Sequence, residues 1–197
     1  MPNWVNNHML VTGKDEQVKL FMDKVAQPTR YKMVRPLSDQ PEEVEERRLF
    51  SFFNVIAPAW EMMDEYAQQP KHSKLLTSDP NWWADTTEIM ATDNSWYNWN
   101  IRNWGTKWDA SEANFQYLPN ETLGRTRVLY TFDTAWDYPE PVYVEMAKQW
   151  PQLNFYIRAL EETGWGVILQ FKEGANVLYK SKDPAPRNFL EGLIKTR

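Results

Sequence analysis

The segment SWYNWNIRNWGTKWD, residues 95–109, holds four of the eleven tryptophans of this 197-residue chain. A buried tryptophan covers a large apolar area and needs an acceptor for its indole N–H, which the interleaved asparagines offer. Trp96, Trp99 and Asn103 have helical spacing, whereas Tyr97, Trp99 and Ile101 alternate as residues of a strand do. We interpret the segment as a short strand that ends in a tight turn.

The turn is expected at Gly105, which lies between the bulky Trp104 and the β-branched Thr106. A glycine there allows a backbone conformation that side chains disfavour. We expect Trp104 and Trp108 to be anchors of the core, because each indole has a large area to bury. The structural motif of the chain is therefore predicted to consist of Asn103, Trp104, Gly105, Thr106, Trp108 and, further along, Trp136.

The composition is that of a folded protein with an acidic surface. Hydrophobic residues make up 42% and aromatic residues 15% of the chain, the net charge is −5, and there is no cysteine. The negative charge argues against broad electrostatic binding to nucleic acid or to an anionic membrane. Without cysteine, disulfides and thiolate metal sites are excluded. No apolar run approaches the roughly 20 residues of a membrane span, and the first residues lack the pattern of a signal peptide. We expect a cytoplasmic protein of a bacterial host cell.

The pattern of apolar residues predicts a mixed α+β domain. Strands are expected at residues 3–12, 49–56, 127–133, 155–159 and 167–171, and helices at 15–25 and 139–150, with a short closing helix at 189–194. Residues 28–47 and 110–125 have the composition of loops, with a short helix possible in the acidic part of the first. Without an insertion at about 58–125, the order is βαββαβ, that of a ferredoxin-like antiparallel sheet with helices on one face. We predict one domain over residues 1–197, with a Trp-rich insertion at about 58–125 and a C-terminal extension at about 180–197.

Several segments resemble one known family. They are residues 1–4 (MPNW) with Asn7 and Gly13, residues 49–52 (LFSF), residues 96–97 (WY), 103–110 (NWGTKWDA), 132–136 (FDTAW) with Pro139 and Pro141, and 150–151 (WP). In these the chain resembles the YubB-type ferredoxin-like, or Api92-like, proteins. Members of that family are carried by phages, plasmids and integrated elements. The resemblance implies a ferredoxin-like fold and a mobile-element origin, and it brings no catalytic residues with it.

The residues for chemistry are few. The two histidines, His8 and His72, do not lie at ligand spacing from an acid, so we expect no metal and no cofactor. No phosphate-binding glycine loop and no nucleophile elbow is present. Lys107 and Asp109 could form an acid/base pair in a pocket beside Asp133. The alternative is a lysine placed over a tryptophan ring as a cation–π contact that fixes the turn, and we favour it.

Two segments are candidates for binding. In the first, aromatic side chains alternate with cations, as in proteins that stack on unpaired bases; its candidate residues are Trp96, Tyr97, Trp99, Arg102, Lys107 and Asp109. The second is the acidic run of Glu42, Glu43, Glu45 and Glu46, which we interpret as a solvated face. Such a run could also meet the basic groove of a nucleic-acid-processing protein.

Three functions remain open at this point. The first is a non-enzymatic binding protein from a phage or mobile element that docks on a host protein, plausibly a nuclease or defence complex. The second is a single-stranded nucleic-acid-binding module, which the acidic balance makes unlikely. The third is a small enzyme of unknown reaction. A homodimer formed through an edge strand is a further expectation.

Overall fold

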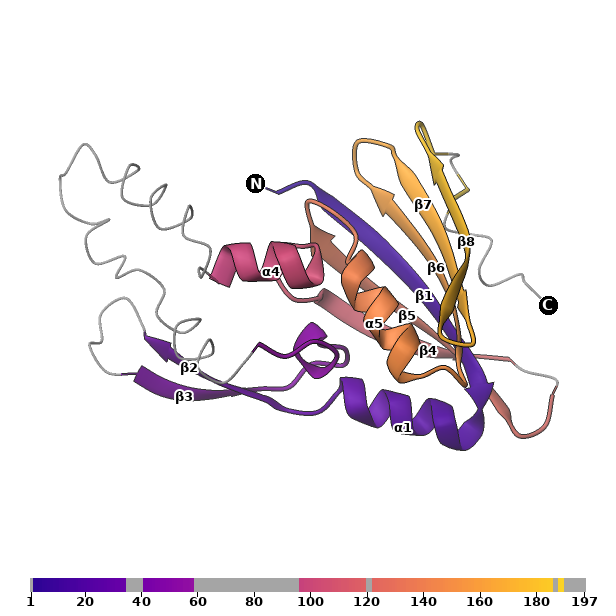
Figure 1. Cartoon of the computed structure of the whole chain (residues 1–197), viewed down its shortest axis with the longest axis horizontal. Helices are drawn as coiled ribbons and strands as arrows, with labels where there is room; N and C mark the ends of the chain where they lie inside the picture. Colours follow the sequence, from indigo (N-terminus) through magenta and orange to yellow (C-terminus); the bar gives the residue numbers. More distant parts are fainter. Residues whose placement is uncertain (1, 35–40, 59–95, 120–121, 186–187, 190–197) are drawn as a thin grey trace.

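The computed structural model describes residues 2–34, 41–58, 96–119, 122–185 and 188–189. It contains a six-stranded antiparallel sheet with the strand order β4-β5-β1-β6-β7-β8 and a separate two-stranded hairpin, β2-β3 (Figure 1). The strands are β1 (Trp4–Lys14), β2 (Thr29–Val34), β3 (Pro41–Glu46), β4 (Ser111–Leu118), β5 (Arg125–Ala135), β6 (Asn154–Glu161), β7 (Gly166–Lys172) and β8 (Ala175–Lys182). The helices are α1 (Asp15–Val25), α4 (Trp96–Trp104) and α5 (Glu140–Gln149), and η1 (Phe52–Asn54) is a short 3₁₀ turn.

The first strand lies at the centre of the large sheet. Val11 of β1 pairs with Val128 of β5 on one side and with Phe155 of β6 on the other, and both pairings are antiparallel. Strand β5 therefore runs parallel to β6, with β1 between them and α5 as the connection. In the same way β4 runs parallel to β1, with β5 between them.

The core lies between the sheet and the helices, which cover one of its faces (Figure 1). Helix α1 has apolar residues at the spacing of one helical face, with Asp15 and Glu16 in the first turn and Lys24 in the last, where they complement the helix dipole. Its Phe21 is fully buried and contacts Phe155 edge to face, with the ring centroids 5.5 Å apart. Helix α5 begins with Pro141 in its first turn, where a proline costs no hydrogen bond, and buries Met146.

The opposite side of the sheet, called here the open face, carries polar residues. Val5, Asn7, Met9 and Val11 of β1 are fully buried beneath the helices. Because neighbouring residues of a strand point to opposite faces, His8 and its cross-strand partners Thr131 and Arg158 lie on the open face.

Several segments differ from the sequence prediction. Residues 49–56 are not a strand: the amide of Ser51 bonds to the carbonyl of Val25, and the 3₁₀ turn η1 follows. Residues 28–47 are not a loop or helix, because they contain the hairpin β2-β3. The predicted loop at 110–125 contains β4. Strand β8, which ends at the start of the predicted C-terminal extension, was not expected. Helix α4 also differs from the prediction and is described with the site below.

The predictions for 3–12, 15–25, 127–133, 139–150, 155–159 and 167–171 are confirmed in type. Residues 59–95, most of the predicted insertion, and 190–197, most of the predicted closing helix, lie outside the described residues. Among the described residues, no helix has both the length and the apolar character needed to cross a membrane.

Candidate functional site

The tryptophan-rich segment forms a helix and not the predicted strand. Helix α4 spans Trp96–Trp104, and the amide Nδ2 of Asn103 donates a 2.8 Å hydrogen bond to the carbonyl of Trp99, one turn earlier. The amide of Gly105 closes the last turn on the carbonyl of Ile101 at 3.1 Å. The helical spacing of Trp96, Trp99 and Asn103 was therefore the correct signal.

Trp104 anchors this helix in the core, as predicted. Its side chain is fully buried, its ring lies edge to face with that of Phe53 at 4.8 Å, and its indole N–H donates to the carbonyl of Ile56 at 3.0 Å. Gly105 has φ +79°, so the prediction of a backbone that disfavours side chains is confirmed. A Cβ at this position would also lie 3.0 Å from Cδ of Pro141 at the start of α5.

The prediction that Trp108 is a core anchor is wrong, because 38% of its surface is exposed. The amine Nζ of Lys107 lies 4.6 Å from the centroid of the Trp108 ring and 5.7 Å from that of Tyr97. Trp4, at the start of β1, packs on Trp108, and the centroids of the two indole rings are 6.0 Å apart. We call Trp4, Tyr97, Lys107 and Trp108 the aromatic–lysine cluster.

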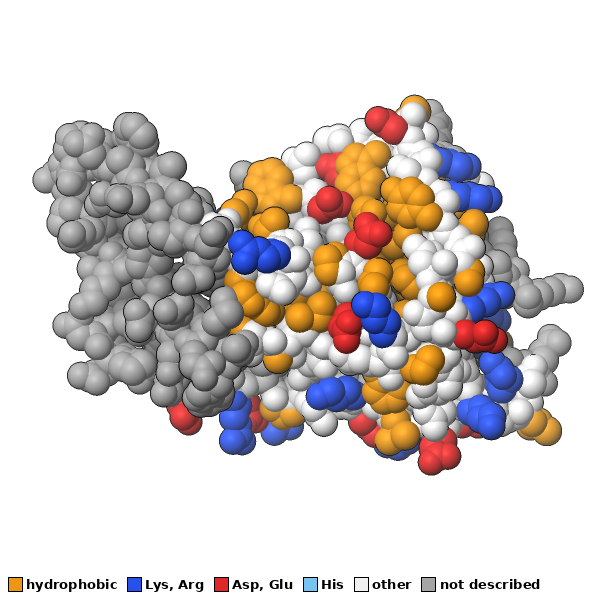
Figure 2. All heavy atoms as spheres, in the orientation of Figure 1, with side chains coloured by type: hydrophobic (Ala, Val, Ile, Leu, Met, Phe, Trp, Pro, Cys, Tyr) orange, Lys and Arg blue, Asp and Glu red, His pale blue; other side chains and the backbone are white. Residues whose placement is uncertain are grey.

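This cluster confirms the cation–π interpretation of Lys107. The sequence analysis missed Trp4 as a member, although its large ring at the very start of a strand was a signal for a site at the strand end. Trp136 is also at this end of the sheet: its amide bonds to the carbonyl of Asn3, its φ is +76°, and its side chain is 49% exposed. Figure 2 shows hydrophobic side chains at the surface on the side of the molecule that carries α4 and α5.

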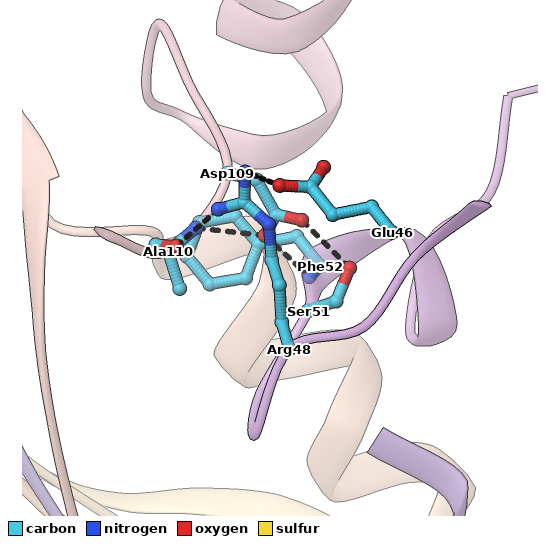
Figure 3. Close-up of polar contacts among 6 residues, drawn as sticks. All are labelled: Glu46, Arg48, Ser51, Phe52, Asp109 and Ala110. Carbon is cyan, nitrogen blue, oxygen red and sulfur yellow. Dashed lines mark hydrogen bonds and ion pairs between the residues drawn. The ribbon is translucent and has the colours of Figure 1, made fainter. Parts of the chain in front are cut away.

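The side chain of Asp109 lies in a network that joins two loops (Figure 3). Its carboxylate accepts hydrogen bonds from the Ser51 hydroxyl at 2.6 Å, from the Phe52 amide at 2.6 Å and from its neighbour Ala110 at 2.7 Å. Burial raises the pKa of Asp109, and these donors together with the nearby Arg48 oppose the rise. The network ties the loop before η1 to the loop after α4.

The other residues of the predicted acid/base pocket are engaged separately. Asp133 of β5 accepts a 2.8 Å hydrogen bond from Nδ2 of Asn6 on β1. Lys107 lies over the aromatic rings, and Asp109 is held by the loop donors. The described residues contain no group of three or more histidine or acidic side chains that could hold a metal ion.

The remaining candidate residues divide between core and surface. Trp99 is only 8% exposed and stacks edge to face on Trp104, so its burial does not favour a role in binding. Arg102 is exposed on α4. The buried Thr106 donates to the carbonyl of Trp108 at 2.8 Å, which closes the turn after the helix. The side chain of Trp96 and the residue His72 lie outside the described part of the chain.

The acidic run lies on β3, and two of its four glutamates form ion pairs with arginines. Glu45 forms ion pairs with Arg30 at 3.0 Å and Arg47 at 3.1 Å, and Glu46 pairs with Arg48 at 2.8 Å. Glu43 is exposed, and the side chain of Glu42 lies outside the described residues. Because the pairs are exposed, each stabilises the hairpin only weakly.

Comparisons with known proteins bear on the fold. No family model matches the chain, and no curated protein matches it. The chain is similar to the crystal structure of the protein Api92 from Yersinia pseudotuberculosis, of family DUF1281, with a TM-score of 0.51 and 11% identity over 94% of this chain and 100% of that one. At this identity the similarity concerns the fold alone, so the resemblance to Api92-like proteins is supported at that level.

Proposed function

We propose that this chain is a non-enzymatic binding protein that docks on another protein through the aromatic–lysine cluster. The observation that carries the proposal is the exposed Trp108, whose ring packs against that of Trp4 at 6.0 Å and lies 4.6 Å from the Lys107 amine. Tryptophan is among the residues that contribute most to the energy of protein interfaces.

The cluster is preorganised, which favours tight binding. The main chain that carries it is fixed by the buried Trp104 before it and by the Asp109 network after it. A ring that is already immobilised loses little conformational entropy when a partner covers it. Lys107 adds a positive charge beside the ring, which would direct a partner's carboxylate or carbonyl oxygen to the cluster.

The partner class follows from the resemblance to proteins of mobile elements. We infer a mobile-element origin and a host protein as the target, plausibly a nuclease or a defence complex. The acidic run is a weaker candidate for the contact than the cluster, since arginines pair with Glu45 and Glu46.

We also infer that β1-α1-β4-β5-α5-β6 is a ferredoxin-like unit. The support is the strand order β4-β5-β1-β6, with a helix after the first and the third strand of the unit. In this interpretation β7 and β8 extend the sheet beyond β6, and residues 26–110 form the insertion, which carries α4 and all members of the cluster except Trp4.

The test compares the full-length protein with two variants as baits in lysates of several bacterial hosts. Trp108→Ala removes the exposed ring of the cluster, and Tyr117→Ala removes an exposed ring near the far end of β4. We expect a host protein that is retained by the wild type and by Tyr117→Ala but lost with Trp108→Ala. With that partner purified, calorimetry should show binding weakened by about thirtyfold, the equivalent of about 2 kcal/mol for a hot-spot residue.

Two results would contradict the proposal. One is a partner that binds Trp108→Ala as tightly as the wild type. The other is quenching of the tryptophan fluorescence by single-stranded DNA or RNA at low salt that disappears at high salt, which would instead support the nucleic-acid alternative.

A further inference from the structure

Arg158 on β6 is a half-buried cation whose hydrogen-bond contacts among the described residues are with neutral oxygen atoms. Its Nη1 donates to the carbonyl oxygen of Phe189, its Nη2 lies 3.4 Å from the Tyr156 hydroxyl, and its Nε has no solvent-exposed surface and no hydrogen-bond partner. Within the described part of the chain, no carboxylate pairs with it. An enclosed charge served only by neutral acceptors is costly, and such charges normally have an anionic partner.

A second unpartnered nitrogen belongs to its neighbour on the next strand. His8 of β1 is the direct cross-strand partner of Arg158, so their Cβ atoms are about 5 Å apart. Its Nδ1 is likewise enclosed and has no hydrogen-bond partner. Two adjacent side chains on one face of the sheet therefore each lack a bond, and a single ligand between them would supply both.

The charges around the pair favour a negative ligand. The cross-strand row of His8 continues through Arg158 and Ile168 to Lys180 of β8, and the next row ends in Lys182. Among the described residues of these two rows, the acidic side chain is that of Asp133, which accepts a hydrogen bond from Asn6. The open face near the pair thus carries more cationic than acidic side chains, although the whole chain is acidic.

We propose that His8 and Arg158 bind a phosphate group on the open face of the sheet. Phosphate offers several acceptor oxygens, and the Nε and Nη edge of a guanidinium matches two of them. His8 donates the third hydrogen bond from Nδ1.

Phe189 is the group that covers this site. Its side chain is 3% exposed, its ring centroid is 6.0 Å from Cζ of Arg158, and it packs on Gly166, where a Cβ would lie 2.7 Å from the ring. A ligand must displace this residue to reach Arg158. Phe189 therefore competes with the phosphate group, and removal of its side chain should strengthen binding.

The test is a titration of the full-length protein with inorganic phosphate and, in a second arm, with adenosine monophosphate. The imidazole proton signals of the two histidines are followed by NMR. We expect saturable shifts of the His8 signal and a raised pKa of His8, because the anion adds a negative charge beside the ring. That ring faces Asp133 and Arg158, and in the free protein burial lowers its pKa. Tighter binding of the nucleotide that is lost in Tyr156→Leu would show that the phosphate arrives with a base.

Three variants separate this site from adventitious binding to surface lysines. Arg158→Met should weaken phosphate binding about tenfold or more, and Phe189→Ala should strengthen it. Lys182→Met, which removes a cation of the same face, should leave the His8 shift unchanged. Circular dichroism checks that each variant is folded, and Gly166→Ala, which displaces the Phe189 ring, replaces Phe189→Ala if that variant unfolds.

The proposal is overturned if neither anion shifts the His8 signal, which would leave water as the bridge between the two nitrogens. It is also overturned if Arg158→Met binds phosphate as well as the wild type does.

Discussion

The hydroxyl of Tyr143 on α5 donates a 2.8 Å hydrogen bond to Oδ1 of Asn7 on β1, and both side chains are fully buried. The same asparagine uses its Nδ2 to reach the carbonyl of Val5 and the hydroxyl of Thr134, each at 2.9 Å. Thr134 in turn donates to the carbonyl of Asp137. A chain of polar groups therefore fixes α5 over the centre of the sheet.

Tyr143→Phe should destabilise the protein by about 1–3 kcal/mol. The substitution leaves Oδ1 of Asn7 buried without a donor, and the cost of such an unpaired group exceeds the loss of an average hydrogen bond. Urea unfolding followed by circular dichroism measures the change. Tyr117→Phe, at an exposed tyrosine, is the control and should change the free energy of unfolding by less than about 0.5 kcal/mol. Equal effects of the two variants would contradict this prediction.

Trp104→Ala should reduce the free energy of unfolding by about 3–5 kcal/mol, because it leaves a large cavity among Phe52, Phe53 and Trp99. It also leaves the carbonyl of Ile56 without the indole donor. The side chain of Trp108 is 38% exposed, so Trp108→Ala is not a core truncation and should reduce the free energy of unfolding far less. Thermal unfolding of both variants decides this, and similar midpoints would show that the exposed ring is as important to the fold as the buried one.

Gly105→Ala should destabilise the protein more than Gly124→Ala. Both glycines have positive φ, +79° and +72°, so either substitution strains the backbone by about 1–2 kcal/mol. A Cβ at Gly124 meets no atom within 4 Å, whereas one at Gly105 lies 3.0 Å from Pro141. The difference between the two unfolding free energies therefore measures the contact between the α4 turn and α5. A larger loss at Gly124 would be the contrary result.

Asp109→Asn should remove a pH dependence of stability. Because the folded-state pKa of Asp109 lies above its unfolded value, the protonated form is favoured in the folded protein. Its contribution to stability is fully present below the unfolded pKa and is lost as the pH rises through the folded pKa. The asparagine can keep the bonds from the Phe52 and Ala110 amides and donate to the Ser51 hydroxyl.

Unfolding free energies measured from pH 4 to 8 test this. Relative to the wild type, Asp109→Asn should gain stability as the pH increases. Asp109→Ala, which leaves both amides unpaired, should be destabilised by about 1–3 kcal/mol throughout. A constant difference between wild type and Asp109→Asn over this range would refute the assignment.

The regular elements were predictable where one periodicity dominates. Val128, Tyr130 and Phe132 recur at every second residue, and Tyr143, Met146 and Ala147 follow a helical face, so β5 and α5 could be identified from local pattern. In α4 the aromatic residues fit both the helical and the strand periodicity. The helix is favoured by the burial of Trp104 against Phe52 and Ile56, which lie 52 and 48 positions earlier in the chain. Such contacts between residues distant in the sequence are tertiary, so a local pattern does not reveal them.

The hairpin β2-β3 shows a different limit. Proline and glutamate are depleted in strands, so residues 41–46 have the composition of a loop. Pairing with the opposite strand, where Arg30 faces Glu45, overrides this preference. In the site, too, local contacts were predictable and distant ones were not. The contact of Lys107 with its neighbour Trp108 could be predicted. The contacts of Trp108 with Trp4 and of Arg158 with Phe189 join residues that are distant in sequence.

The central position of β1 determines the order in which the chain can assemble. Val11 is made early by the ribosome, but its neighbours Val128 and Phe155 lie 117 and 144 residues later in the chain (128 − 11 and 155 − 11). During synthesis β1 therefore remains unpaired, with its apolar face exposed, until most of the protein has been translated. Closing such long loops makes folding slow and leaves the nascent chain open to aggregation. We expect fragments that end before residue 125 to be insoluble. We also expect the production of this protein to depend on chaperones that bind the unpaired β1.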